Sequence, residues 1–181
     1  MNSSSPTTLK ASELRRVFDQ ARAVPSFAFA ETQNENLLAI RVSRDPYAIR
    51  ANEISGLATD RKIVAFPSPF SELLGVAGVR GALVPVYSLA ALLGYDTGAE
   101  QARWLALCGI EEPFALAFKG LEGYARVPQT QLYPAEQKDA TRTFVTHMAR
   151  AADTVRGVLS IPSLRQVIQE RCRNGSTSKE R

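Results

Sequence analysis

Residues 73–87, LLGVAGVRGALVPVY, decide between the possible folds of this chain. A glycine stands at every third position from Gly75 to Gly81, with a single arginine, Arg80, and with Pro85 inside a run of β-forming residues. A dinucleotide-binding loop needs a helix N-terminus directly after its glycines to receive the pyrophosphate. The strand-like ALVPVY follows instead. The phosphate-loop interpretation therefore fails on its context.

The same stretch favours two strands joined by a tight turn. Glycine supplies the positive φ that a tight turn needs, which places Arg80 and Gly81 at the turn. Proline cannot donate to a strand ladder, so Pro85 belongs at an edge or a bulge. No acidic residue lies within six positions of Arg80. A solvated surface arginine is one interpretation; the other is a contact for a second protein, because arginine is enriched at binding hot spots.

Length and composition describe an ordinary globular protein. The chain has 181 residues, 45% of them apolar and 22% charged, enough for one domain or for two small subdomains that share a boundary. The formal charge is +4, but residues 165–181 alone hold five Lys/Arg against two Asp/Glu. A nucleic-acid-binding barrel needs a basic stripe with interleaved aromatics. We therefore expect no nucleic-acid partner.

The sequence carries no recognisable catalytic or metal-binding motif. His147 is the single histidine, and neither C-x-x-C, H-E-x-x-H, G-x-S-x-G nor a Walker A loop is present. We therefore expect no enzymatic activity, no metal and no cofactor. Cys108 lies in an apolar run and Cys172 in a charged one, which fits two free thiols in the cytoplasm. The longest uncharged stretch, residues 81–95, is too short for a spanning helix, so no direct membrane insertion is expected.

Short strands dominate the rest of the pattern. Apolar periodicity predicts an N-terminal helix over residues 8–23 and a C-terminal helix that starts at Pro162. Between them, eight to ten short strands are separated by turns, with one short helix closed by Gly94. This spacing argues for small β-barrels rather than a parallel sheet. Turns are expected at residues 111–112 and 120–123, a turn-rich segment at residues 66–75 and a loop at residues 129–141.

Residues 73–94 resemble the signature of the CheW-like domains, the coupling modules of bacterial chemotaxis. Seven positions agree with that signature at ungapped spacing: Gly75, Val79, Arg80, Gly81, Pro85, Val86 and Leu89. Upstream, the strand at 37–43 and the segments YAI and ISGL also fit, and downstream GVLSIPSLRQVI does. The resemblance covers about residues 36–168.

The resemblance implies a mainly β fold with two small SH3-like five-stranded β-barrel subdomains packed together. An extra N-terminal helix and a C-terminal helix would complete the chain. The expected organisation is an N-terminal extension over residues 1–31, a CheW-like domain over residues 32–170 and a polar basic tail over residues 171–181.

The resemblance also implies a non-catalytic adaptor in a chemosensory array, which is cytoplasmic and recruited to membrane-associated receptors. Its partners would be the cytoplasmic tip of a chemoreceptor and the regulatory domain of a CheA-type histidine kinase. By analogy, Arg80, Gly81 and Val79 would face the receptor, whereas Ile54 and Leu57 would face the kinase. Gly75, Gly78 and Pro85 would shape the turn.

Three positions depart from the family pattern. The asparagine before the arginine is Gly78, the aspartate after the proline is Ser88, and the glutamate of the V-x-E-I strand is Gly56. These losses suggest an alternative, a divergent protein that modulates or competes in another chemosensory pathway without standard kinase coupling. A different class, a small-ligand-binding β-barrel, would need Tyr87, Ser88 and His147 to converge in one pocket.

Overall fold

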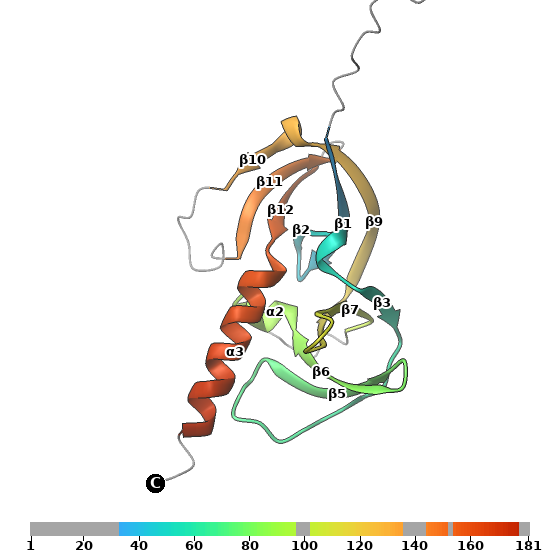
Figure 1. The fold of residues 1–181 in the computed structure, drawn as a ribbon. Helices are drawn as coiled ribbons and strands as arrows, with labels where there is room; N and C mark the ends of the chain where they lie inside the picture. The colour runs from blue at the N-terminus through green and yellow to red at the C-terminus, as the bar shows by residue number, and fades with distance from the viewer. Residues whose placement is uncertain (1–32, 97–101, 136–143, 152–153, 178–181) are drawn as a thin grey trace, which may run out of the picture. The chain divides into compact units, whose positions relative to one another are not determined.

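The structure is a computed structural model that describes residues 33–96, 102–135, 144–151 and 154–177 (Figure 1). The helix expected at residues 8–23 lies outside the described residues. The described chain is mainly β and forms two six-stranded sheets. Within these residues, no helix is long and apolar enough to cross a membrane.

The first sheet is built from both ends of the described chain. Its order is β10-β11-β12-β2-β1-β9. The strands are β1 (Asn34–Val42), β2 (Asp45–Arg50), β9 (Gly120–Pro128), β10 (Leu132–Pro134), β11 (Val145–Ala151) and β12 (Thr154–Leu159). All neighbours are antiparallel except β12 and β2, which pair in parallel with Gly157 opposite Tyr47. This parallel pair joins the C-terminal hairpin to the N-terminal one.

The second sheet comes from the middle of the chain, in the order β3-β7-β8-β6-β5-β4. Its strands are β3 (Gly56–Thr59), β4 (Ile63–Val64), β5 (Leu73–Val79), β6 (Ala82–Ser88), β7 (Trp104–Cys108) and β8 (Phe114–Phe118). Here β6 and β8 are the parallel pair, with Tyr87 opposite Leu116. Each sheet thus combines several antiparallel hairpins with one parallel pair, and the parallel neighbours β6 and β8 are separated in the chain by α2 and β7.

Two α-helices pack against the apolar core that the two sheets share. The short α2 (Leu89–Leu92) is capped by Ser88, whose Oγ accepts the N–H of Ala91 at 3.2 Å. The long α3 (Ile161–Thr177) begins after Ser160, whose Oγ accepts the N–H of Ser163. Two single turns, η1 (Ala51–Glu53) and η2 (Gln129–Gln131), precede β3 and β10. The C-terminal helix expected at Pro162 is confirmed, and it extends to Thr177.

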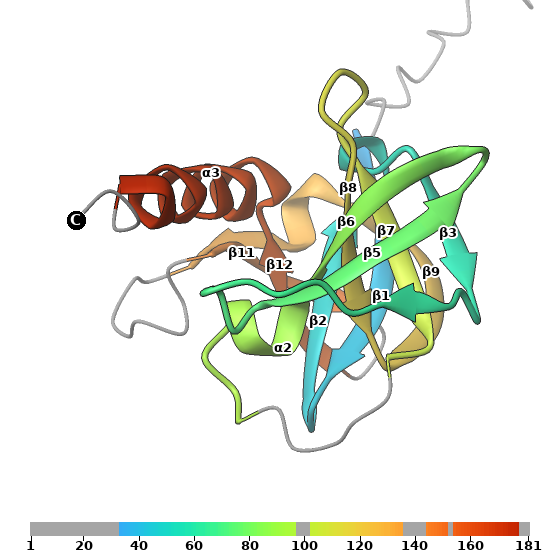
Figure 2. The same cartoon turned by 90° about the horizontal axis from the view of Figure 1, so that it is seen from below.

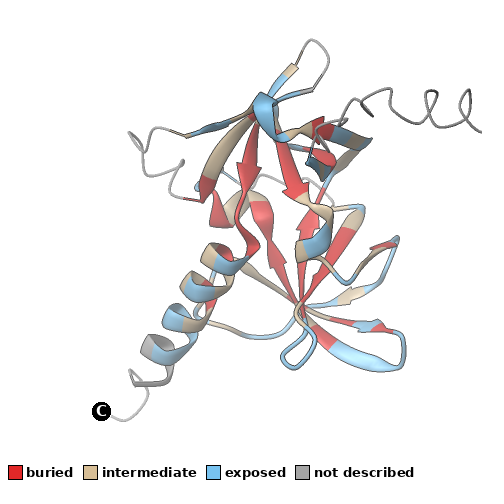
Figure 3. Ribbon diagram, turned by 45° about the horizontal axis from the view of Figure 1, so that its top comes forward, coloured by how far each residue is buried: buried red, intermediate tan, exposed pale blue. Residues whose placement is uncertain are grey.

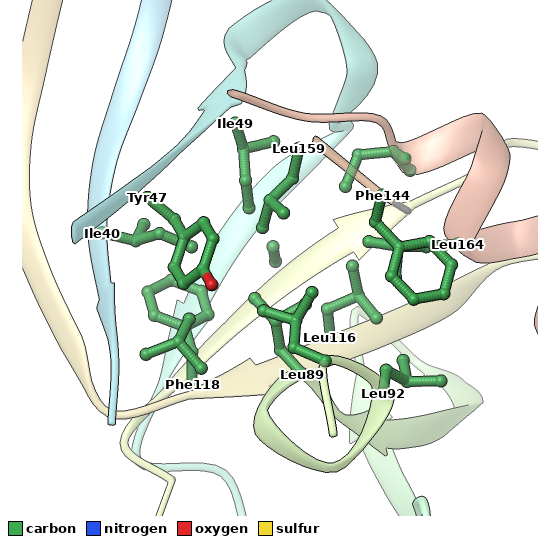
Figure 4. Close-up of a cluster of buried hydrophobic side chains, with 14 of the residues drawn as sticks. Ile40, Tyr47, Ile49, Leu89, Leu92, Leu116, Phe118, Phe144, Leu159 and Leu164 are labelled. Atoms are coloured by element: carbon green, nitrogen blue, oxygen red, sulfur yellow. The ribbon is translucent and has the colours of Figure 1, made fainter. Parts of the chain in front are cut away.

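Three apolar clusters stabilise the molecule. The largest takes residues from both sheets and from α2 and α3, and Figure 4 shows Ile40, Ile49, Leu116 and Leu164 among its members pointing toward one another. A second cluster is made by the second sheet alone, and a third by the first sheet alone. Figure 3 shows the buried residues on the strands where the sheets meet, while α3 is buried along one side only. Each sheet therefore encloses a small core and shares the large one.

The strand count differs from the sequence prediction of five in each subdomain. The additional strands are β4 and β10, which have two and three residues and lie at sheet edges. β10 lies within the loop expected at residues 129–141. The turn expected at residues 120–123 is wrong, because these residues belong to β9. Gly123 has φ 150° and sits at a register shift against Ala39 and Ile40, so its glycine freedom serves a bulge. In each sheet, the described strands pair in a row that begins and ends with an edge strand. Closure of either sheet into an SH3-like barrel therefore stays a prediction.

Candidate partner-binding site

The β5–β6 hairpin ends in a two-residue turn that displays Arg80. Val79 pairs with Ala82, and the two residues between them have positive φ, 50° for Arg80 and 83° for Gly81. Positive φ at both central positions is the pattern of a type I′ turn, which matches the twist of the flanking strands. The expected hairpin is confirmed. Figure 2 shows it projecting at the end of the second sheet, close to β3.

The guanidinium of Arg80 lies against the backbone of Gly56 in β3. A Cβ placed on Gly56 would lie 2.9 Å from Nη2 and 3.7 Å from Cζ of Arg80. Arg80 itself is exposed and makes no hydrogen bond or ion pair to any described residue. Its positive charge is therefore fixed in place by packing and remains available to another molecule.

The two strands of the hairpin divide their side chains between core and solvent. Val79 is 5% exposed and belongs to the core cluster of the second sheet, so it holds the hairpin from inside. On the opposite face, Leu83 is 77% exposed and stands across from Gly78. Leu83 was missed by the sequence reasoning. The alternation of Val84 and Val86 toward the core would have placed it on the outer face.

Ile54 and Leu57 precede and follow Gly56 in the sequence, but the side chain of Leu57 lies on the face of the sheet opposite to the one on which Gly56 meets Arg80. Both are half-buried and pack against the large core cluster. β3 is an edge strand of the second sheet, and the N–H of Ser55 donates to the carbonyl of Leu107 at 2.7 Å, which ties the segment to β7. The structure therefore places Arg80, expected to face the receptor, against the strand that carries Leu57, expected to face the kinase, and leaves the two contacts on different side chains.

The residues expected to shape the turn have different surroundings. Gly75 has φ 142°, and a Cβ there would lie 2.0 Å from the carbonyl oxygen of Val64. Gly78 is exposed, and a Cβ there would meet no atom within 4 Å. Pro85 lies opposite Val76, one residue before β6 begins to pair with β8. Of the two glycines, only Gly75 has a backbone conformation and a neighbour that require glycine.

Tyr87, Ser88 and His147, the residues of the alternative ligand-binding class, have separate partners. Tyr87 contacts the Sγ of Cys172 at 3.8 Å, and burial raises the pKa of its hydroxyl to about 12. Ser88 is used as the cap of α2. His147 lies in the other sheet, where its Nδ1 accepts from Nη2 of Arg50 at 3.1 Å. No shared pocket for the three side chains results.

Arg50 and Glu53 form a structural network next to His147. The Nε of Arg50 donates to Glu35 at 3.1 Å, and its Nη1 lies 3.4 Å from Glu53. Glu53 in turn accepts the N–H of Ile161 at 2.8 Å, at the start of α3. These bonds join β1, β2 and β11 to the helix. Within the described ranges, no three His, Cys, Asp or Glu side chains are grouped as a metal site would require.

Comparison with known protein families shows which family this chain belongs to. The family model of the CheW-like domain matches residues 36–171, more than half of the chain. The chain belongs to the CheW-like family. Among curated proteins, none is significantly similar to this CheW-like chain.

A solved structure supports the fold of this CheW-like protein. The chain is similar to the scaffolding protein TtCheW from Thermoanaerobacter tengcongensis, with a TM-score of 0.66 and 14% sequence identity. The similarity covers 72% of this chain and 92% of TtCheW. The resemblance inferred from residues 73–94 is thus confirmed, and the matched region ends within α3.

Proposed function

We propose that this CheW-like protein is a chemosensory adaptor that connects the cytoplasmic tip of a chemoreceptor to the regulatory domain of a CheA-type histidine kinase. The observation that carries the proposal is the placement of Arg80, an exposed guanidinium at a hairpin tip that has no partner among the described residues and lies against Gly56 of the edge strand β3. Membership of the CheW-like family supports a scaffold role in chemotaxis.

On the receptor side, the proposed contacts are Arg80, Gly81 and the exposed Leu83. A guanidinium beside an apolar side chain suits the surface of a helical receptor tip, where arginine fixes orientation and leucine buries area. Val79 contributes by holding the turn, since its side chain is buried.

On the kinase side, the proposed contacts are Ile54 and Leu57. They lie on or beside β3, whose outer edge has no partner strand among the described residues. A barrel domain of similar construction would bury these side chains against its own apolar strand face. Such an adaptor would act in the cytoplasm, at membrane-associated receptor arrays, without catalysing a reaction.

The receptor contact is tested by binding to a purified receptor fragment. We expect Arg80→Ala to weaken binding at least about fivefold, the effect of a residue worth roughly 1 kcal/mol at an interface. Arg61→Ala is the matched control. Arg61 is also exposed, lies in the loop between β3 and β4, and makes no hydrogen bond or ion pair to another described residue. Circular dichroism should be unchanged in both. Receptor capture that survives Arg80→Glu would contradict the proposal.

The kinase contact is tested separately. We expect Ile54→Glu to reduce binding of the kinase regulatory domain while receptor binding persists, because the two contacts use different side chains. Simultaneous loss of both would indicate misfolding. If the unmodified protein bound the receptor but not the kinase, the result would favour the alternative role of a divergent protein that competes in another pathway. Gly56 suggests this alternative, because it stands beside Arg80 where the family pattern has a glutamate.

A further inference from the structure

A second surface lies on the first sheet, away from Arg80, and has more arginine than acidic side chains. It is a hollow of about 340 Å³ on β9, bounded by Gln131 and by residues of β1, β11 and β12. Three arginines line it, Arg126, Arg150 and Arg156, against one acid, Glu122. The lining of the hollow therefore carries a net charge of +2, three guanidiniums minus one carboxylate.

Glu122 is already shared between two arginines. Its Oε1 accepts from Nε of Arg41 at 2.6 Å, and its Oε2 lies 2.6 Å from Nη1 of Arg156. The side chain of Arg156 is 12% exposed, and its Nη1 is buried and lacks a well-aligned hydrogen bond despite the short distance. One carboxylate thus does not satisfy the guanidiniums around it.

Arg126 and Arg150, which also line the hollow, have no acidic partner among the described residues. Both are exposed, and neither makes a hydrogen bond or an ion pair to another described residue. Like charges placed together on a concave surface repel one another and raise the local potential, which attracts anions. The hollow is therefore suited to a ligand that brings carboxylates.

We propose that this hollow binds an acidic segment of a partner protein, with Arg126 and Arg150 contacting its carboxylates. β9 is an edge strand of the first sheet, so its backbone groups lie beside the hollow and can bind an extended segment. Tyr124, 62% exposed, adds a flat apolar surface there. A single-stranded nucleic acid would need several stacking aromatics along a basic groove. One tyrosine and a short arginine group fit an acidic peptide better.

The proposal goes beyond the adaptor function and does not depend on it, because the hollow shares no residue with the receptor or kinase contacts. The measurement is fluorescence anisotropy of a labelled hexaglutamate peptide titrated with the full chain at low salt. Hexaglutamine serves as the uncharged probe. We expect hexaglutamate to bind and hexaglutamine not to bind.

Variants assign the binding to the hollow. We expect Arg126→Ala with Arg150→Ala to weaken hexaglutamate binding about tenfold, the combined effect of two charged contacts at a partly exposed site. The matched control is Arg61→Ala with Lys62→Ala, which removes two exposed positive charges from the second sheet's loop and should change the affinity less than about twofold. Glu122→Gln should act in the opposite sense and tighten binding, because it releases Arg41 and Arg156.

Several outcomes would overturn the proposal. The first is that hexaglutamate does not bind, and the second is that the control variant loses as much affinity for it as the Arg126 and Arg150 variant. The third is that a twelve-nucleotide single-stranded DNA or phosphatidylserine vesicles bind through the same arginines more tightly than hexaglutamate does. Circular dichroism checks that each variant is folded, and if Glu122→Gln is not, the comparison of the two double variants decides alone. The Arg126 and Arg150 variant should retain receptor and kinase binding, so failure here would leave the adaptor proposal standing.

Discussion

Gly56 and Arg80 are interdependent, although 24 positions separate them in the sequence. The guanidinium occupies the space that a side chain at position 56 would take. A glutamate, the residue of the family pattern, would compete for this space and could form an ion pair with Arg80. The glycine instead leaves Arg80 resting on the backbone with its charge unpaired among the described residues. The departure at Gly56 thus changes how the hairpin arginine is presented.

The glycines of the hairpin should respond differently to a methyl group. We expect Gly75→Ala to lower the free energy of unfolding by about 3 kcal/mol, because its φ of 142° is strained for alanine and its Cβ would collide with the carbonyl of Val64. Gly78→Ala should change it by no more than about 0.5 kcal/mol, because the added Cβ meets nothing within 4 Å. Urea denaturation of both variants measures the difference. Equal effects would show that the Val64 contact does not decide the role of Gly75.

The sequence could predict the hairpin but not this difference. The type I′ turn follows from local chemistry, because Arg80 and Gly81 stand between two β-forming runs. The requirement for Gly75 comes from β4, a two-residue strand that follows no periodic pattern. Evenly spaced glycines look equivalent until the neighbouring strand is placed beside one of them. The same holds for Arg80, whose contact with Gly56 depends on a strand that is remote in sequence.

Glu122 links three strands of the first sheet, since it lies in β9 and contacts Arg41 of β1 and Arg156 of β12. Partial burial alone would raise its pKa, but the close guanidiniums of Arg156 and Arg41 outweigh it and hold the pKa below the ordinary value. A carboxyl whose pKa is lower in the folded state stabilises the fold above its unfolded pKa. This contribution disappears as the pH falls through the folded pKa.

The pH dependence of unfolding tests this link. We expect the protein to lose stability as the pH falls below about 4.5, the ordinary pKa of a glutamate. Glu122→Gln should be less stable at pH 7 and should lose less on acidification, because its amide does not titrate. Glu111→Gln is the control, since Glu111 is an exposed acid in the β7–β8 turn. Parallel pH profiles for Glu122→Gln and the unmodified protein would refute the role of Glu122.

Elements formed by local pairing were predictable, whereas those formed by distant pairing were not. The β1–β2 and β11–β12 hairpins and the two helices at Ser88 and Pro162 follow from periodicity, turns and caps. The parallel pairs β2–β12 and β6–β8 join segments whose sequences carry no sign of their register. The edge strands β4 and β10 are too short for alternation to appear. Topology therefore had to come from the family resemblance or from the structure.

At the scale of the molecule, the large core cluster couples the two sheets. It draws Ile40 and Leu159 from the first sheet, Leu116 and Cys108 from the second, and Leu164 from α3. Opening either sheet would expose this shared apolar surface, which favours one cooperative transition over two independent ones. The position of Cys108 inside this cluster provides a test, because its thiol is reached only when the sheets separate.

The two thiols should react with an aromatic disulfide reagent in two distinct phases. Cys172 is exposed, whereas Cys108 is buried. Burial, with a smaller contribution from the carboxylate of Glu53, raises the pKa of the Cys108 thiol to about 12, so it carries almost no thiolate at pH 8. We expect one rapid equivalent in native protein, none in Cys172→Ser, and two in denaturant. The slow phase of Cys108 should accelerate with urea in step with the loss of circular dichroism. A native Cys108 that reacts as fast as Cys172, or before the secondary structure is lost, would mean that the sheets separate without unfolding.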